Sequence, residues 1–253
     1  ERRARGLTPT EAADMLLEYH RACRAQQEHL NTRLQELRGM RRGNVHLMIS
    51  EGFIDSLMEH VVGPFCIEHP RINVSVNVGS VNEVVEAVAT DAAHIGLAYN
   101  PPVDPRLRCR ASRKHPVCLL AARGHALARR RAPLTIADIL PYPFALMSAP
   151  YGLRQAVDLL EFTERIHLTP SLTTNSLRVL KQYAISGAGV TLMPNLGVHH
   201  ELASGELVAL PIAHPILSAP ECQMLLRLGR PLSSAANEVV RRIEQRLPAF
   251  AAP

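Results

Sequence analysis

Polar side chains that could bind a small molecule follow the ends of several apolar segments in this sequence. Serine, threonine and asparagine offer hydroxyl or amide groups there, and a helix starting at such a point adds free backbone amides that favour a carboxylate or a phosphate. Each residue alone could equally be a plain helix cap. The candidate ligand contacts are Ser50, Glu51, Ser80, Val81, Asn82, Tyr99, Asn100, Met147, Ser148, Asn175, Ser176, Thr191 and Met193.

Glu51 is the one charged residue in this set, and it leaves two ligand chemistries open. Amides at helix starts favour an anion, so a small organic acid or a related metabolite is one prediction. A carboxylate that faces the same site would oppose an anion and favour an amine or a hydroxyl-bearing ligand. The sequence does not identify the ligand further.

Motifs for catalysis, for metal ions and for cofactors are absent from the sequence. His199 and His200 are adjacent, which places them about 100° apart on a helix, and no His-Glu-x-x-His spacing occurs. Gly187 and Gly189 lack the third glycine of a dinucleotide fingerprint. The five cysteines are scattered, which indicates neither a zinc site nor a disulfide framework: Cys23, Cys66, Cys109, Cys118 and Cys222. The sequence therefore predicts no enzyme, no metal and no cofactor.

Short apolar strands alternate with helical patterns from residue 45 onward. The predicted strands are Val45–Ser50, Ile72–Val78, Ile95–Tyr99, Val117–Ala122, Phe144–Met147, Leu172–Asn175, Val190–Met193, Leu207–Pro211 and Gln223–Arg227. The predicted helices are Phe53–Ile67, Val81–Thr90, Gly152–Phe162, Leu177–Ser186, Leu196–Ala203 and Ala235–Leu247. Such alternation predicts an α/β fold with parallel sheets covered by helices on both faces.

Several segments, in a fixed order, resemble one known family. Ser186–Pro194 reads as a helix end, a glycine turn and a buried strand stopped by proline, and Glu201–Val208 reads as a helix whose glycine exit leads into an edge strand. Phe65–Pro70, Leu134–Leu140 and Gly229–Ala236 stand at matching places before and after them. This order resembles LysR-type transcriptional regulators, in which a GxGxxxLP strand precedes a helix ending in LxxGxL.

The resemblance implies two Rossmann-like subdomains joined by a hinge, with a type 2 periplasmic-binding-protein-like fold, and a long dimerisation helix before them. It implies that residues 44–122 and 223–253 form effector subdomain I and that residues 123–222 form subdomain II. The candidate contacts would converge on the cleft between the subdomains, where a small metabolite changes oligomer geometry to control transcription. The alternatives are a solute-binding receptor of the same bilobal fold and, less favoured, an enzyme on that scaffold.

Residues 9–39 are predicted to form one long linker helix. Thr8, Pro9 and Glu11 mark its start, because they suit a cap, a first helical position and a capping box. Apolar residues recur at steps of four and three, the spacing of a two-stranded coil: Leu16, Cys23, Leu30, Leu34 and Leu37, with His20 and Gln27 between them. A narrow stripe of this kind needs a partner, so a homodimer or homotetramer is predicted; the alternative is a helix that folds back on its own domain.

Arg2, Arg3 and Arg5 crowd the N-terminus at a spacing suited to DNA phosphates, although a solvated basic tail is the alternative. The resemblance implies that residues 1–8 are the remnant of a DNA-binding wing, and that DNA is read through a winged helix-turn-helix that is not present in this chain.

Composition agrees with a regulator of this kind. The 253 residues are 47% apolar and 20% charged, with a formal net charge of +5, as in ordinary globular proteins. No apolar run reaches the roughly 18 residues that a membrane-spanning helix needs, and the N-terminus has no apolar signal region. A cytoplasmic protein without membrane partners is therefore predicted.

Overall fold

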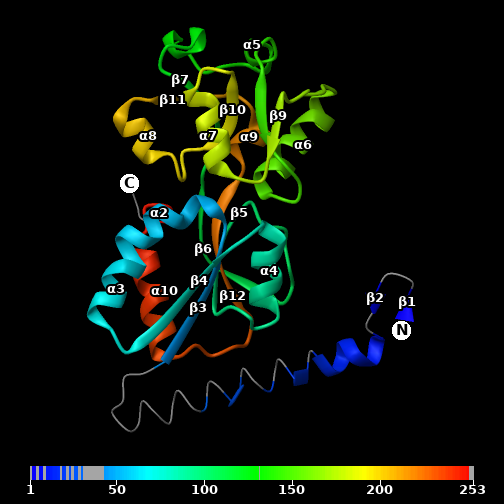
Figure 1. Ribbon diagram of the computed structural model, residues 1–253, viewed down its shortest axis with the longest axis vertical. Coiled ribbons are helices and arrows are strands. Elements are labelled where there is room, and N and C mark those ends of the chain that lie inside the picture. Colours follow the sequence, from blue (N-terminus) through cyan, green and yellow to red (C-terminus); the bar gives the residue numbers. More distant parts are fainter. Residues whose placement is uncertain are drawn as a thin grey trace.

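The computed structural model describes residues 2–3, 6–7, 10–17, 19–20, 23, 26–27, 30, 43–130 and 132–250. Within this part, the chain forms two five-stranded sheets, each covered by helices and stacked end to end along the long axis of the molecule (Figure 1). None of the helices in the described ranges combines the length and the apolar character needed to cross a membrane.

The first sheet has the strand order β4-β3-β5-β12-β6. Its strands are β3 (Gly43–Ile49), β4 (Ile72–Val78), β5 (Ile95–Tyr99), β6 (Leu107–Lys114) and β12 (Glu221–Arg227). Its helical elements are η1 (Glu51–Phe53), α2 (Ile54–Leu57), the π turn η2 (Met58–Val62), α3 (Gly63–Glu68), α4 (Val81–Ala89) and α10 (Ser234–Arg246). One face packs against α10 and the α2–α3 segment, and α4 covers the other (Figure 1). We call this unit subdomain I.

The second sheet has the strand order β11-β7-β10-β8-β9. Its strands are β7 (Val117–Ala122), β8 (Phe144–Met147), β9 (Leu172–Thr174), β10 (Val190–Pro194) and β11 (Leu207–Pro211). Its helical elements are η3 (Ala126–Arg129), α5 (Ile136–Ile139), α6 (Gly152–Glu164), α7 (Leu177–Ile185), α8 (His199–Ser204) and α9 (Pro215–Ser218). Helix α7 packs against β7, β8 and β10, while α6 packs against α9 and β8. We call this unit subdomain II.

All nine predicted strands are present, and the α/β fold class is confirmed. The prediction of parallel sheets is wrong, because both sheets are mixed. In subdomain I, β12 runs antiparallel to β5 and β6, and in subdomain II, β7 runs antiparallel to β10 and β11. These antiparallel strands are the ones on which the chain crosses between the sheets, so they arrive from the opposite end.

Two strand assignments differ from the predicted organisation. The edge strand β6 was not predicted, because Arg108, Arg110 and Arg113 interrupt its apolar pattern. The predicted boundary after residue 122 is wrong for β7, which pairs with β10 and β11 in subdomain II. The apolar side chains of Leu119 and Leu120 are fully buried there, so the core of subdomain II holds this strand.

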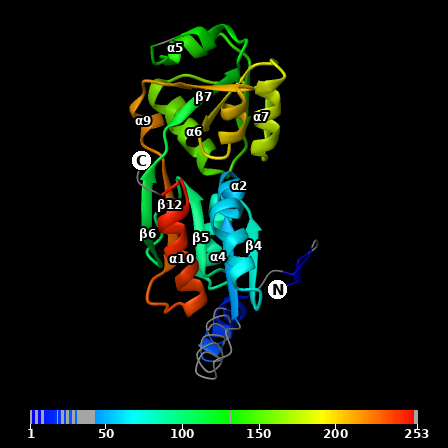
Figure 2. The same cartoon turned by 90° about the vertical axis from the view of Figure 1, so that its left-hand side faces the viewer.

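The chain crosses between the subdomains twice, and the two crossings are hydrogen-bonded to each other. One leads from β6 to β7 through His115 and the other leads into β12 through Pro220, side by side in both views (Figures 1 and 2). The His115 N–H donates to the Pro220 carbonyl at 2.9 Å, and the Tyr99 hydroxyl donates to the His115 carbonyl at 2.9 Å. This pair of segments is the connection about which the subdomains can move.

The N-terminal helix extends away from both sheets (Figures 1 and 2). Its described residues 11–17, 19–20, 23, 26–27 and 30 are helical, and the side chains of Leu16 and Leu30 are 69% and 58% exposed. The exposed seam residue Cys23 lies on the same helix. Leu34 and Leu37 lie outside the described residues, as do all residues from 31 to 42.

The start of this helix differs from the prediction. Thr8 and Pro9 lie outside the described residues, and Thr10 is the observed cap: its Oγ1 accepts from the Ala13 N–H at 3.2 Å, and its carbonyl accepts from the Asp14 N–H at 3.0 Å. Before the helix, β1 (Arg2–Arg3) and β2 (Gly6–Leu7) form a two-residue antiparallel ladder. Arg5 lies outside the described residues.

Candidate functional site

A partly open cavity lies between the two subdomains. Its walls come from the ends of strands and the starts of helices, which is where ligands bind in α/β sheets. Subdomain I contributes residues that follow β3, end β5 or begin α4. Subdomain II contributes residues that end or follow β8 and β10 or begin α6 and α7. The lining residues are Ser50, Glu51, Gly52, Val81, Tyr99, Met147, Tyr151, Gly152, Leu153, Leu177, Pro194 and Leu196.

Glu51 crosses the cavity and caps helix α7 of the other subdomain. Its Oε2 accepts from the Leu177 N–H at 2.8 Å, and its Oε1 accepts from the Arg178 N–H at 3.3 Å and from the Ser176 hydroxyl at 3.2 Å. Ser176 makes no side-chain cap of its own, so the carboxylate of Glu51 satisfies amides at the positive end of this helix. The side chain of Glu51 therefore already occupies the position where an anion would bind at the start of α7.

The subdomains touch closely at Gly152, the first residue of α6. A Cβ atom at this position would lie 2.0 Å from the Tyr99 carbonyl oxygen and 3.1 Å from that of Asn100. Asn100 has a φ of 51° and donates its Nδ2 hydrogen to the Gly152 carbonyl at 3.2 Å. Only glycine allows the two backbones to approach this closely.

Five of the predicted contacts line the cavity: Ser50, Glu51, Val81, Tyr99 and Met147. Burial raises the pKa of Tyr99 far above its ordinary value, so its hydroxyl is a neutral hydrogen-bond donor. That hydroxyl is directed to the His115 carbonyl in the hinge rather than to the cavity. Ser50 follows β3, and its backbone N–H donates to the Leu97 carbonyl at 2.8 Å.

Four other predicted contacts do not line the cavity. Ser80 is the cap of α4, and its hydroxyl and N–H both donate to Glu83 Oε2, at 2.8 and 2.7 Å. These bonds hold the pKa of the Glu83 carboxyl below its usual range. Asn82 is exposed on α4, Asn100 holds Gly152, and the Ser148 N–H donates to the Thr174 carbonyl at 2.8 Å.

The remaining four predicted contacts also do not line the cavity. Asn175 is exposed before α7, and Ser176 reaches the site only through its bond to Glu51. Thr191 and Met193 are fully buried within β10, where the Thr191 hydroxyl donates to the Ala145 carbonyl at 2.8 Å. Both faces of this strand are covered. A residue can therefore lie near the end of a strand without its side chain reaching the cavity.

Seven lining residues were not predicted: Gly52, Tyr151, Gly152, Leu153, Leu177, Pro194 and Leu196. Most are apolar. Gly52, Leu177 and Pro194 directly follow predicted contacts, and Gly152 and Leu196 begin predicted helices, so apolar residues near strand ends and helix starts were the missed signal. Tyr151 is the polar one. Its pKa is raised by burial and then by the charges of Glu83 and Glu51, so its hydroxyl also stays neutral. The cavity thus combines an apolar body with neutral hydroxyls and two nearby carboxylates.

All five cysteines are free thiols, and Cys222 is buried, while Cys66 and Cys109 are exposed on subdomain I. One group of described residues has the side chains to hold a metal ion, namely Glu59, His199 and His200.

Comparisons with known proteins agree on one family. The profile of the LysR substrate binding domain matches residues 38–248. The HTH-type transcriptional activator CmpR of Synechocystis is 21% identical over 204 residues, which are 80% of this chain and 66% of CmpR. The chain therefore spans just under two thirds of that relative.

Two solved structures show the same fold. The regulatory domain of Synechocystis CcmR, in complex with 2-PG, aligns with a TM-score of 0.69 at 20% identity, over 79% of this chain and 95% of that domain. Full-length CbnR, complexed with its target DNA, aligns with a TM-score of 0.63 at 15% identity, over 94% of this chain and 82% of CbnR. Because the family profile covers residues 38–248 and both sheets follow the fold of these domains, the chain belongs to the LysR substrate-binding domain family.

Proposed function

We propose that this chain is the effector-binding and oligomerisation portion of a ligand-responsive transcriptional regulator. The observation that carries this proposal is the cavity between the subdomains, whose walls come from both of them. A ligand that contacts both walls favours the arrangement in which they are close, and so shifts the population of open and closed forms. The regulatory domain of CcmR, which has this fold, is bound to 2-PG.

A thermal melting screen against a library of small metabolites tests this function. A ligand that binds the folded protein raises the melting midpoint by mass action, by an amount that grows with its concentration. We expect at least one metabolite to do so. A solute-binding receptor would show the same shift, but the long exposed helix before subdomain I favours the regulator. The residues that line the cavity include no nucleophile in contact with a base, so catalysis is not proposed.

We propose that the effector binds chiefly through hydroxyl or amine groups and an apolar body. Glu51 already occupies the amides of α7, and Glu83 adds a second carboxylate nearby. An organic acid would have to displace Glu51 or place its own charge beside it. Neutral hydroxyls at Ser50 and Tyr151, together with Leu177 and Leu196, suit a ligand with few charges.

Replacing Glu51 with glutamine tests this preference. The substitution keeps the length of the side chain and removes the charge, so the repulsion toward an anionic ligand is lost. We expect anionic members of the library to gain at least about fivefold in affinity, while neutral ligands change little. Calorimetry measures both, and Glu86→Gln, an exposed carboxylate on α4, is the matched control. Equal ligand preferences in wild type and Glu51→Gln would contradict this role.

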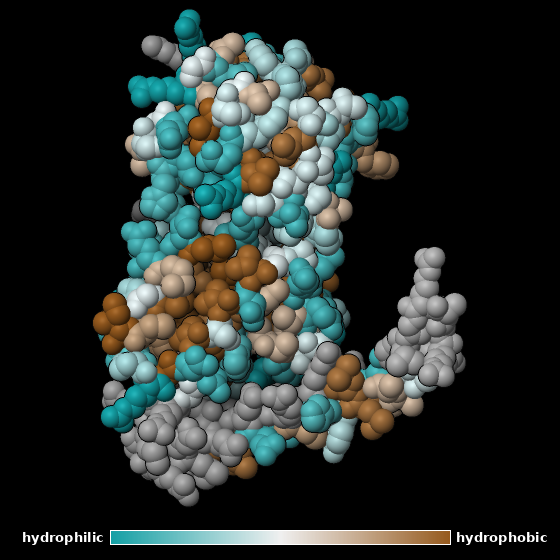
Figure 3. Space-filling view, viewed as in Figure 1, coloured by the Kyte–Doolittle hydropathy of each residue, from teal (hydrophilic) through white to brown (hydrophobic). Residues whose placement is uncertain are grey.

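We propose that the chain assembles as a homodimer or homotetramer. The exposed seam residues of the N-terminal helix provide one surface. A second apolar area lies over α2, α3 and β4 on the face shown in Figure 3, where Ile67 is 83% exposed and Val78 is 48% exposed. Two separate apolar surfaces allow two different contacts between copies, as a tetramer requires.

We further propose that the regulator acts on DNA in the cytoplasm. CmpR is an HTH-type activator, and the CbnR structure contains target DNA. DNA would be read through a winged helix-turn-helix that lies outside these 253 residues. Arg2, Arg3 and Arg5 would contact phosphates, because arginines at such spacing bind the backbone without reading sequence. Subdomain movement would then alter the geometry of the paired DNA-binding units.

A further inference from the structure

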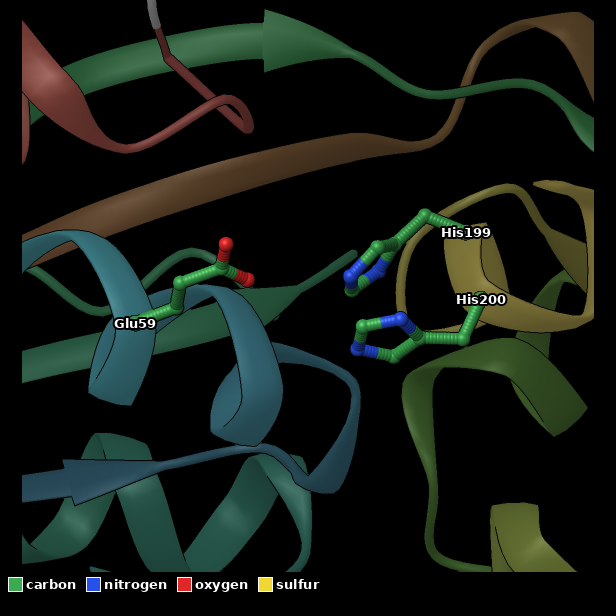
Figure 4. Close-up of side chains that lie close together, drawn as sticks. All are labelled: Glu59, His199 and His200. Carbon is green, nitrogen blue, oxygen red and sulfur yellow. The ribbon is translucent and has the colours of Figure 1, made fainter.

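Glu59 comes from subdomain I, His199 and His200 come from subdomain II, and their side chains face each other across the gap between the subdomains (Figure 4). Glu59 lies on η2 of subdomain I, and the two histidines are the first residues of α8 in subdomain II. One ligand atom from each side chain lies within 4.8 Å of the other two. Figure 4 shows the carboxylate of Glu59 facing both imidazoles across the gap.

The backbone that carries these three residues is fixed by contacts on both subdomains. Val198, just before α8, is fully buried, and Lys181 donates to the Gly197 carbonyl at 3.0 Å and pairs with Glu201 at 2.7 Å. These contacts fix the start of α8. The rings of His199 and His200 lie together there, with centroids 3.9 Å apart, so both imidazoles lean toward one side.

On the other side, Glu59 stands in a π turn. Gly63 donates its N–H to the Met58 carbonyl to close this turn, and a Cβ atom at Gly63 would lie 2.7 Å from that oxygen. Pro64 follows and has no N–H to continue a regular helix. The wider turn therefore follows from the Gly63-Pro64 pair, and single π turns are frequent at functional sites.

Two imidazoles and one carboxylate are the ligands that zinc-class divalent ions bind, with a water completing the tetrahedron. With metal–ligand bonds of about 2.1 Å, tetrahedral ligand atoms lie roughly 3.4 Å apart. In this structure the ligand atoms lie within 4.8 Å of one another. All three side chains are exposed, so they can rotate until these atoms reach the shorter spacing of a tetrahedral site. A hard ion such as Mg²⁺ prefers oxygen ligands and does not suit this set.

The charges around the group also favour a cation. Glu59 Oε2 lies 4.0 Å from His60 Nε2. Glu201 follows His200 directly, and its Oε2 is buried without a hydrogen-bond partner within the described part of the chain. Lys181 neutralises the other oxygen of Glu201, which leaves Glu59 as the charge available to an ion held by the histidines.

We propose that Glu59, His199 and His200 form a binding site for a zinc-class divalent ion that bridges the two subdomains. The ion binds with all three ligands only when the subdomains are close, so it stabilises the closed arrangement. This site does not depend on the identity of the effector, because the ligand atoms lie outside the cavity lining.

Calorimetric titration of the metal-free protein with zinc chloride, without effector, tests the site. We expect one bridging ion per chain, and a loss of at least about tenfold in affinity in His199→Asn, in His200→Asn and in Glu59→Gln. His167→Asn, an exposed histidine on subdomain II away from the group, is the matched control and should bind zinc as wild type does. Magnesium chloride should produce no heat of binding at this site.

Small-angle X-ray scattering tests whether the ion holds the two subdomains together. Zinc should reduce the radius of gyration of wild type but not that of Glu59→Gln, while the melting midpoints without metal stay the same. Zinc affinity in Glu59→Gln equal to that of wild type would place the ion on one subdomain and overturn the bridge. Failure of zinc to bind wild type below about 100 µM would overturn the site, and so would zinc affinities in both histidine variants equal to that of wild type.

Discussion

Replacing Gly152 with alanine is expected to force the two subdomains apart and to destabilise the protein by about 3 kcal/mol. The new Cβ atom would lie 2.0 Å from the Tyr99 carbonyl oxygen, and neither atom can rotate away because both belong to backbone or are fixed to it. Alanine is slightly more stable than glycine in a helix, so a lower free energy of unfolding would come from the contact between the subdomains. Urea unfolding and small-angle scattering should show the lower stability and the larger radius of gyration.

Gly124→Ala is the matched control for this substitution. A Cβ atom at Gly124 would meet no other atom within 4 Å, and this glycine lies in a turn at the surface of subdomain II. Its replacement should leave both stability and radius of gyration unchanged. Wild-type behaviour of Gly152→Ala in both measurements would show that the subdomains do not approach each other at this point.

The double variant Leu16→Glu, Leu30→Glu is expected to convert the oligomer to a smaller species. Both side chains are more than half exposed in the single chain, so the change should leave the subdomains intact. In a paired helix the same positions are buried, where four carboxylates per pair would be costly. We expect association to weaken by at least about 100-fold, which sedimentation equilibrium measures.

Met15→Glu is the control on the same helix. Met15 is 66% exposed and lies next to Leu16 but off the seam, so its replacement should leave the oligomer unchanged. If the double variant sediments with the same mass as wild type, this helix does not form the interface. The apolar area over α2, α3 and β4 would then be the candidate surface for contacts between copies.

The strands were the part of the fold that could be predicted most directly. The five residues of β5 are all buried, and their continuous apolar run identified the strand from end to end. Strand β6 has the opposite character, since arginines alternate with small residues along an edge. Its pairing with β12 depends on a strand more than 100 residues later in the chain, which no local pattern records.

For the site, the sequence predicted which strand ends lie near the cavity, but not which side chains line it. Residues that follow β3 or end β5 and β8 do line the cavity, because ligands bind at strand ends in this class of fold. The orientation of each side chain was not predictable, as Thr191 shows by donating into its own sheet. The contact between Glu51 and Leu177 joins residues 126 positions apart, so only the fold reveals it.

The group of Glu59, His199 and His200 could not be predicted from the sequence either. Metal motifs in a sequence are spacings within one helix or loop, and His199 and His200 match none of them. The third ligand, Glu59, comes from the other subdomain, and its π turn depends on the following Gly63-Pro64 pair. A site formed across a hinge therefore leaves no continuous pattern in the sequence.

We expect an effector to bind in the cavity between the subdomains. The most direct test is calorimetry, in which the metabolite that raises the melting midpoint most is titrated into wild type, Leu177→Trp and Val179→Trp. Leu177 lines the cavity, whereas Val179 lies two residues along the same helix and is 41% exposed. The tryptophan at 177 should fill the cavity and weaken binding at least about tenfold, while the one at 179 should leave affinity unchanged. Equal affinity of all three proteins for the ligand would show that it does not bind in this cavity.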